Sequence, residues 1–182
     1  ELVQETFGQK PADIIFLLDS SLGLQSQAEA LRQPIAELVH HLSTGDRLWV
    51  FAVHTRPTLL VNTEVIQDET REALAQKILT LSLPSAKETD LGAGLSAVSD
   101  IVGRNNAAED IFIVVASDWC HNPSVQSRYD TGGRGCRAIR DIEELAGYFR
   151  RSSTGKRVTV QYLTEKREGQ DPKTPAELQK VL

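Results

Sequence analysis

Oxygen-bearing side chains cluster in this sequence at the ends of apolar segments, where they could bind a metal ion. These side chains are Asp19, Ser20, Ser21, Thr89, Asp90 and Asp118. Carboxylate and hydroxyl oxygens are hard donors that suit magnesium, manganese or calcium better than zinc or copper. Magnesium keeps several of its waters, so it requires few protein oxygens. The side chains therefore predict a divalent-cation site, provided that the fold brings them together.

Each of these side chains also has a simpler interpretation. Asp19 or Asp118 alone could accept hydrogen bonds from backbone N–H groups at the start of a helix or turn. For either residue alone, this capping role is the better interpretation. When Thr89 is considered with them, capping and cation binding both stay open.

The scaffold that would position these side chains is an alternation of strand-sized apolar runs and amphipathic segments. Strands are expected at 13–19, 47–53, 110–117 and 158–163, with 58–61 as an antiparallel edge partner of 47–53. Helices are expected around 26–42, 68–80, 90–103, 139–149 and 174–182. The first should begin with a capping box at Ser26 and Glu29 and should be kinked by Pro34.

This order predicts a doubly wound, mainly parallel α/β sheet of about five strands, with helices on both faces and one antiparallel edge strand. Strands 13–19 and 110–117 should be central neighbours. In such sheets ligands bind beyond the carboxyl ends of the strands, which is where the oxygen-bearing side chains are expected to lie.

Length and composition exclude several classes of protein. Residues 1–182 are expected to form a single domain with its core at 13–163. A composition of 40% hydrophobic and 25% charged residues is typical of a globular protein. No apolar run approaches the roughly 20 residues that cross a bilayer. A net charge of −5 offers nucleic acid no general attraction. We expect neither membrane insertion nor nucleic-acid binding.

Three short motifs resemble the von Willebrand factor type A domain family. In that family an Asp-x-Ser-x-Ser turn, a Thr from a second loop and an Asp from a third form the metal-ion-dependent adhesion site. This sequence has DSSLG at 19–23, KETDLGAGL at 87–95 and IFIVVASD at 111–118. The order of the motifs and their places relative to strands and helices match the family, and the resemblance covers about residues 13–163.

The resemblance implies a cation site and a mode of binding. The residues that it implies at the ion are Asp19, Ser21 and Thr89, directly or through water, and Asp118, which would bind through water or lie just behind the ligands. The implied cofactor is Mg²⁺, with Mn²⁺ and Ca²⁺ as alternatives, and a carboxylate of a partner protein would fill the open coordination position. The domain would then be a protein-binding module and not an enzyme.

Two departures from the family pattern bear on this site. Gly23 replaces the second serine and removes one hydroxyl ligand, and Trp119 stands where the family usually has glycine, so it could crowd the site. Either water replaces the missing ligand and affinity falls, or the fold is kept and the ion is lost. The second outcome would make the domain a metal-free scaffold within a larger assembly.

Partner contacts are expected at the carboxyl edge of the sheet, with the long loop 118–136 shaping specificity. The candidate contact residues are Ser20, Gly23, Asp90, Trp119 and His121. A hydrolase of the haloacid dehalogenase type would also place an Asp after the first strand. It would need a second Asp where Ser21 stands, so this alternative is weaker.

Cys120 and Cys136 are the only cysteines and lie on either side of a polar, Gly-rich stretch. In an oxidising compartment a disulfide between them would stabilise the fold by roughly 3 kcal/mol, whereas in the cytosol both would be free thiols. A zinc site formed with His121 has no standard ligand spacing. The cysteine pair and the family resemblance together favour an extracytoplasmic location.

Overall fold

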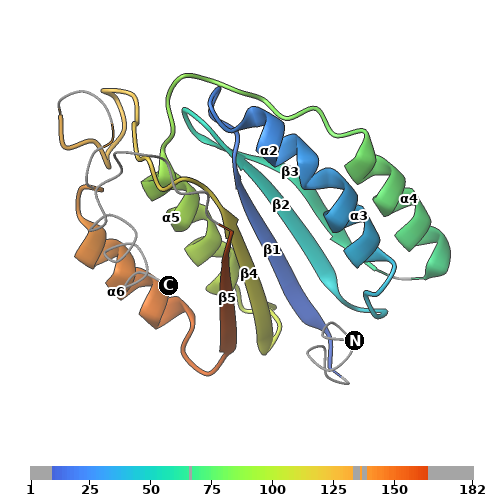
Figure 1. The fold of residues 1–182 in the computed structure, drawn as a ribbon. Helices are drawn as coiled ribbons and strands as arrows, with labels where there is room; N and C mark the ends of the chain where they lie inside the picture. The colour runs from blue at the N-terminus through green and yellow to red at the C-terminus, as the bar shows by residue number, and fades with distance from the viewer. Residues whose placement is uncertain (1–9, 66, 133–135, 137–138, 164–182) are drawn as a thin grey trace.

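The computed structural model describes residues 10–65, 67–132, 136 and 139–163, and these form a five-stranded sheet flanked by helices (Figure 1). The strand order is β3-β2-β1-β4-β5. The strands are β1 (Ala12–Asp19), β2 (Arg47–Val53), β3 (Pro57–Glu64), β4 (Asp110–Ala116) and β5 (Arg157–Leu163). Neighbouring strands are parallel except for the antiparallel pair β2–β3. The predicted mainly parallel sheet with one antiparallel edge strand is confirmed.

Strand β1 lies at the centre of the sheet because it pairs with β2 on one side and β4 on the other. All eight of its residues are buried, as expected for a parallel strand that is covered on both faces. Leu18 is in register with Ala52 of β2 and Ala116 of β4. The carboxyl ends of β1 and β4 are therefore adjacent, as predicted.

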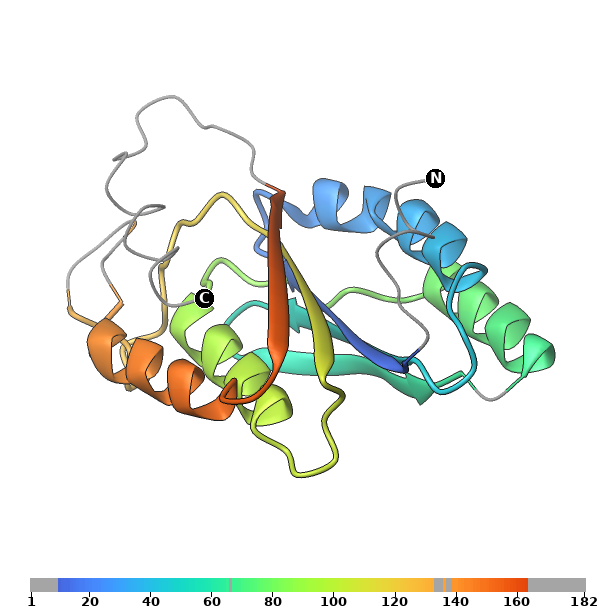
Figure 2. The same cartoon turned by 90° about the horizontal axis from the view of Figure 1, so that it is seen from below.

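Helices cover both faces of the sheet (Figure 2). One face carries α2 (Gln25–Ala30), α3 (Arg32–Val39) and α4 (Asp68–Leu79), and the other carries α5 (Leu91–Val102) and α6 (Ile142–Ser152). Successive side chains of a strand point to opposite faces. Ile14 and Phe16 of β1 consequently belong to the core under α2–α4, while Ile15 and Leu17 belong to the core under α5 and α6.

The first helical segment differs from the prediction in two respects. The capping-box prediction is wrong, because α2 begins at Gln25 and its cap residue, Leu24, makes no side-chain cap. The segment also divides at Leu31, between α2 and α3, and not at Pro34. Proline has no N–H to donate to the carbonyl four residues earlier, and its ring clashes with that carbonyl. The carbonyl in question is that of Ala30, so α2 ends there.

The remaining elements lie close to their predicted positions. Strand β3 is longer than the predicted 58–61 because it pairs along the whole of β2, from Arg47–Glu64 to Val53–Pro57. Helix α6 begins later than predicted because Asp141 has a left-handed φ of 58°. The predicted helix at 174–182 lies outside the described residues. None of the helices in the described part of the chain has the length and apolar character needed to span a bilayer.

Candidate cation-binding site

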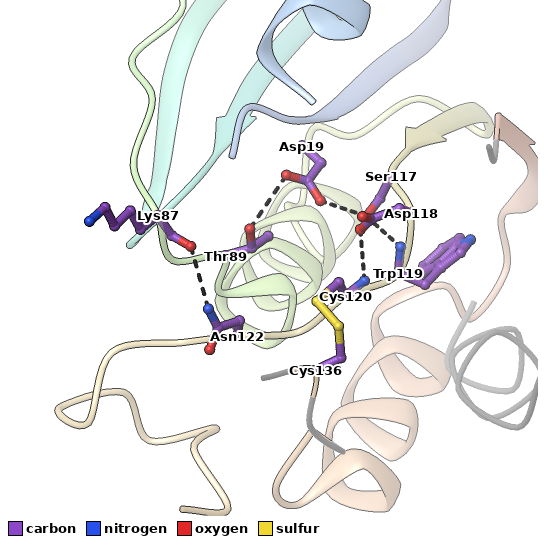
Figure 3. The surroundings of a disulfide bond; sticks show 9 residues. All are labelled: Asp19, Lys87, Thr89, Ser117, Asp118, Trp119, Cys120, Asn122 and Cys136. Carbon is purple, nitrogen blue, oxygen red and sulfur yellow. Dashed lines mark hydrogen bonds between the residues drawn. A yellow bond between two sulfur atoms is a disulfide. The ribbon is translucent and has the colours of Figure 1, made fainter. Parts of the chain in front are cut away.

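Asp19, the last residue of β1, is the centre of a hydrogen-bonded cluster at the carboxyl edge of the sheet (Figure 3). Its Oδ1 accepts a hydrogen bond of 3.0 Å from the backbone N–H of Ser21. Its Oδ2 accepts one of 2.8 Å from the hydroxyl of Ser117, and the hydroxyl of Thr89 lies 3.5 Å from Oδ1. Only 2% of Asp19 is exposed. These partners satisfy hydrogen bonds but bring no positive charge to a buried carboxylate.

The second carboxylate of the cluster belongs to Asp118, which follows β4 and is also only 2% exposed. Its Oδ1 accepts a hydrogen bond of 2.9 Å from the backbone N–H of Cys120. Burial raises the pKa of Asp19 above its ordinary value, and the negative charge of Asp118 raises this pKa further, against the lowering effect of the hydrogen bonds from Ser21 and Ser117. The charge of Asp118 thus acts on Asp19 in the same direction as burial does.

Thr89 is held at this edge by backbone pairing across two loops. Its N–H donates to the carbonyl oxygen of Asn122, and the N–H of Asn122 donates to the carbonyl oxygen of Thr89, both at 2.9 Å. The turn after β1 is held in a similar way, because Ser21 forms an isolated β-bridge with Ala86. The chain from 86 to 89 thus runs between the turn after β1 and the loop after β4.

The fold brings the four predicted ligands to one edge. Ser21 and Thr89 reach Asp19 through hydrogen bonds, and Asp118 acts on it through its charge. The four groups come from the end of β1 and the turn after it, the loop after β4 and the loop before α5. Their oxygen chemistry suits a hard divalent cation.

Two residues of the cluster were not predicted. Ser117 donates to Asp19 and accepts a hydrogen bond of 2.9 Å from the backbone N–H of Trp119. Its place directly before Asp118 is a sequence signal that could have identified it. Asn122 pairs with Thr89 through its backbone, and such a contact leaves no side-chain signature in the sequence.

The predicted partner contacts are mostly buried. Ser20 is 0% exposed and Asp90 is 3% exposed. Ser20 donates from its hydroxyl to the carbonyl oxygen of Val53, and Asp90 caps α5 by accepting from the N–H of Ala93. These side chains hold the edge together, so we do not retain them as partner contacts. Gly23 is exposed, as a contact residue must be.

Trp119 and His121 are also internal. The Trp119 ring packs edge-on against Tyr162, with centroids 5.2 Å apart, and points away from Asp19 and Thr89 (Figure 3). It therefore does not crowd the cluster. Trp119 has a left-handed φ of 61°, a conformation that favours glycine, the residue usual at this position in the family that the sequence resembles. His121 is 0% exposed, and its Nε2 lies 3.0 Å from the carbonyl oxygen of Tyr129, so this nitrogen carries the proton.

The structure joins Cys120 and Cys136 by a disulfide, with Cα atoms 4.8 Å apart (Figure 3). Cys120 is only two residues from Asp118, so the bond lies beside the cluster. It connects the start of the loop after β4 to the part of the chain before α6. The alternative of two free thiols does not apply to this structure.

A groove of about 430 Å³ opens beside the two carboxylates. Asp19 and Asp118 lie in its wall, and most of its remaining lining is apolar. The apolar side chains come from the first helical segment and the ends of β4 and β5, and they are Leu24, Ala28, Leu31, Ala116, Tyr162 and Leu163. The edge therefore combines negative charge with an adjacent apolar hollow.

A family model described as the von Willebrand factor type A domain matches residues 12–128. Similar solved structures include proximal thread matrix protein 1 from the mussel byssus, with 16% identity, a TM-score of 0.63, and coverage of 93% of this chain and 41% of that chain. Another is the pilus adhesin SpaC from Lactobacillus rhamnosus GG, with 12% identity, a TM-score of 0.60, and coverage of 97% of this chain and 27% of that chain.

A further structure of the mussel protein is described as having a zinc-occupied MIDAS motif, that is, an occupied metal-ion-dependent adhesion site. It is 15% identical to this chain with a TM-score of 0.60, and the similarity covers 94% of this chain and 41% of that one. The chain thus spans less than half the length of these proteins, and identities this low show a common fold alone. No match was found among curated proteins.

Proposed function

Because this chain belongs to the von Willebrand factor type A family, we propose that it is a module that binds a partner protein through a divalent cation at the carboxyl edge of its sheet. The observation that carries the proposal is the pair of buried carboxylates, Asp19 and Asp118, which lie at one edge of the sheet and line the same groove. The proposed ligands, direct or through water, are Asp19, Ser21, Thr89 and Asp118. The proposal assigns the domain no catalytic reaction.

The donor set fits a hard cation such as Mg²⁺ or Mn²⁺. Two carboxylates and two hydroxyls are all oxygen donors, and Mg²⁺ normally keeps several waters. Gly23 contributes no hydroxyl where the family has its second serine, so a water can take that position. A cation between the two carboxylates would offset the negative charge that both bring to this edge. When bound, the cation supplies the charge that a carboxylate of the partner requires.

Exposed apolar side chains next to the cluster support a protein partner. Leu22, in the turn after β1, is 56% exposed, and Leu163, at the end of β5, is 37% exposed. We propose that the partner presents an acidic residue to the cation and apolar side chains to this surface and to the adjacent groove.

The disulfide supports a location outside the cytoplasm. Disulfides form and persist in oxidising compartments and are rare in the cytosol, where thiols are kept reduced. The Cys120–Cys136 bond is thus the observation that favours a secreted, cell-surface or periplasmic protein. This agrees with the names of two proteins that share the fold, the matrix protein from the mussel byssus and the pilus adhesin.

The test is calorimetric titration of the protein with MgCl₂ and MnCl₂. The wild type should give a binding isotherm with one ion per chain, and the variants Asp19→Asn and Asp118→Asn should not. Asp68→Asn is the matched control, because this carboxylate is 89% exposed and begins α4 on the surface. A partner captured by the wild type should be released by a chelator. Absence of heat with both ions, and capture that resists the chelator, would favour the metal-free scaffold.

A further inference from the structure

We propose that the Cys120–Cys136 disulfide holds the candidate cation site in its binding geometry, so that the redox state of this bond sets the affinity for the cation. The inference rests on the proposed function and adds redox regulation of cation binding to it. Reduction should loosen the site while the sheet stays folded. The chain segment beside the disulfide contacts several of the proposed ligands.

The segment 117–122 contacts three of the four proposed ligands. At its start, the Ser117 hydroxyl donates to Asp19 at 2.8 Å. In its middle, the N–H of Cys120 donates to the Asp118 carboxylate at 2.9 Å. At its end, Asn122 and Thr89 exchange two backbone hydrogen bonds of 2.9 Å. A shift of this segment would therefore move the cluster as a whole.

The backbone of this segment is held against its own preference. Trp119 has a φ of 61°, a left-handed conformation that is unfavourable for a residue with a large side chain. Such a conformation persists only when its surroundings enforce it. The Cys120 bond to Cys136 lies one residue away and is the only covalent constraint of this kind, since the chain has two cysteines.

Between the two cysteines, noncovalent contacts alone hold the loop to the rest of the fold. Its middle carries the exposed side chains Val125, Gln126 and Arg128. Its internal anchors include Tyr129, whose carbonyl oxygen accepts from the N–H of Arg140 at 2.9 Å. Opening the disulfide removes the covalent closure of this loop, and local opening then becomes easier than global unfolding.

The bond is accessible to a reductant. Cys136 is exposed and Cys120 is partly exposed. A dithiol reductant attacks one sulfur, forms a mixed disulfide and then closes to its own disulfide, which leaves both cysteines as thiols. The reductant loses two electrons and the protein disulfide gains them, so no other reactant is required.

The experiment compares the oxidised wild type with Cys120→Ser/Cys136→Ser by calorimetric titration with MnCl₂ and by amide hydrogen exchange. The variant should bind Mn²⁺ about 10- to 100-fold more weakly, the usual effect of removing groups that orient metal ligands. The amides of residues 89, 120 and 122 should lose protection while those of β1 keep it. Arg47→Ala is the matched control, because it weakens the opposite end of the sheet and should leave Mn²⁺ affinity unchanged.

The outcomes separate this inference from the proposed function. Equal Mn²⁺ affinity and equal loop protection in the wild type and the double variant would overturn the inference and leave the cation site standing. If the oxidised wild type binds no Mn²⁺, the proposed function fails, and loss of protection confined to residues 89, 120 and 122 would still support the positioning role. Should the double variant not fold, reduced wild type takes its place. Loss of β1 protection there would overturn the inference.

Discussion

Replacing Gly92 by alanine should destabilise the protein, although alanine is the better helix former. Gly92 is the second residue of α5 and lies against Tyr129 of the loop 118–136. A Cβ at position 92 would lie 2.4 Å from Cγ of Tyr129, 2.7 Å from its Cβ and 2.8 Å from its Cδ1. These atoms are at the base of the ring, so rotating the side chain cannot relieve all three contacts.

The size of the effect follows from how firmly Tyr129 is held. Its N–H donates to the Ser127 hydroxyl at 3.1 Å, and its carbonyl oxygen accepts from the N–H of Arg140 at 2.9 Å. Overpacking against such a residue costs about 1–3 kcal/mol. The gain in helix propensity on replacing glycine is at most about 1 kcal/mol and is smaller in the first turn of a helix. We expect a net loss of about 1–2 kcal/mol, combining these two ranges.

Gly147→Ala is the matched control. Gly147 lies inside α6, and its Cβ would meet only the end of the flexible Arg151 side chain, at 3.3 Å. This variant should gain about 0.5–1 kcal/mol. Thermal unfolding measures both, since a chain of this size shifts its Tm by about 2–4 °C for each kcal/mol. A Gly92→Ala protein that matches Gly147→Ala in stability would refute the packing of Tyr129 on α5.

Three further predictions concern the site and its scaffold. Asp19→Asn should change the stability of the metal-free protein by no more than about 1 kcal/mol, because the amide can still accept from Ser21 and donate to Ser117. It should abolish the stabilisation of about 2.7 kcal/mol that Mg²⁺ at 100 times its Kd confers, measured by thermal unfolding with and without Mg²⁺. Gly23→Ser restores the hydroxyl missing from the motif and should raise Mn²⁺ affinity roughly threefold to tenfold; unchanged calorimetric affinity would place position 23 away from the ion. Arg47→Ala removes the ion-pair partner of Asp13, whose side chain is 0% exposed, and should cost about 3–5 kcal/mol in urea unfolding. A loss below about 1 kcal/mol, the range of surface ion pairs, would contradict the buried ion pair.

The helical elements show where sequence reasoning reached its limit. The apolar faces of α2 and α3 and a kink caused by Pro34 follow from the sequence, but the position of the break does not, because the effect of proline falls on the carbonyl of Ala30. At α6 the predicted start was too early because a left-handed φ at Asp141 has no reliable sequence signal. Ends of helices depend on such local details more than their existence does.

The sequence by itself determined the strands, the parallel sheet and the approach of Asp19 to Asp118. Apolar runs separated by helices lead to right-handed crossovers, and carboxyl ends of neighbouring parallel strands meet at one edge. Only the tertiary structure decided that Ser20, Asp90, Trp119 and His121 are buried and that Asn122 pairs with Thr89. The physical reason is that these outcomes depend on backbone hydrogen bonds and packing between distant loops, and neither leaves a periodic pattern in the chain.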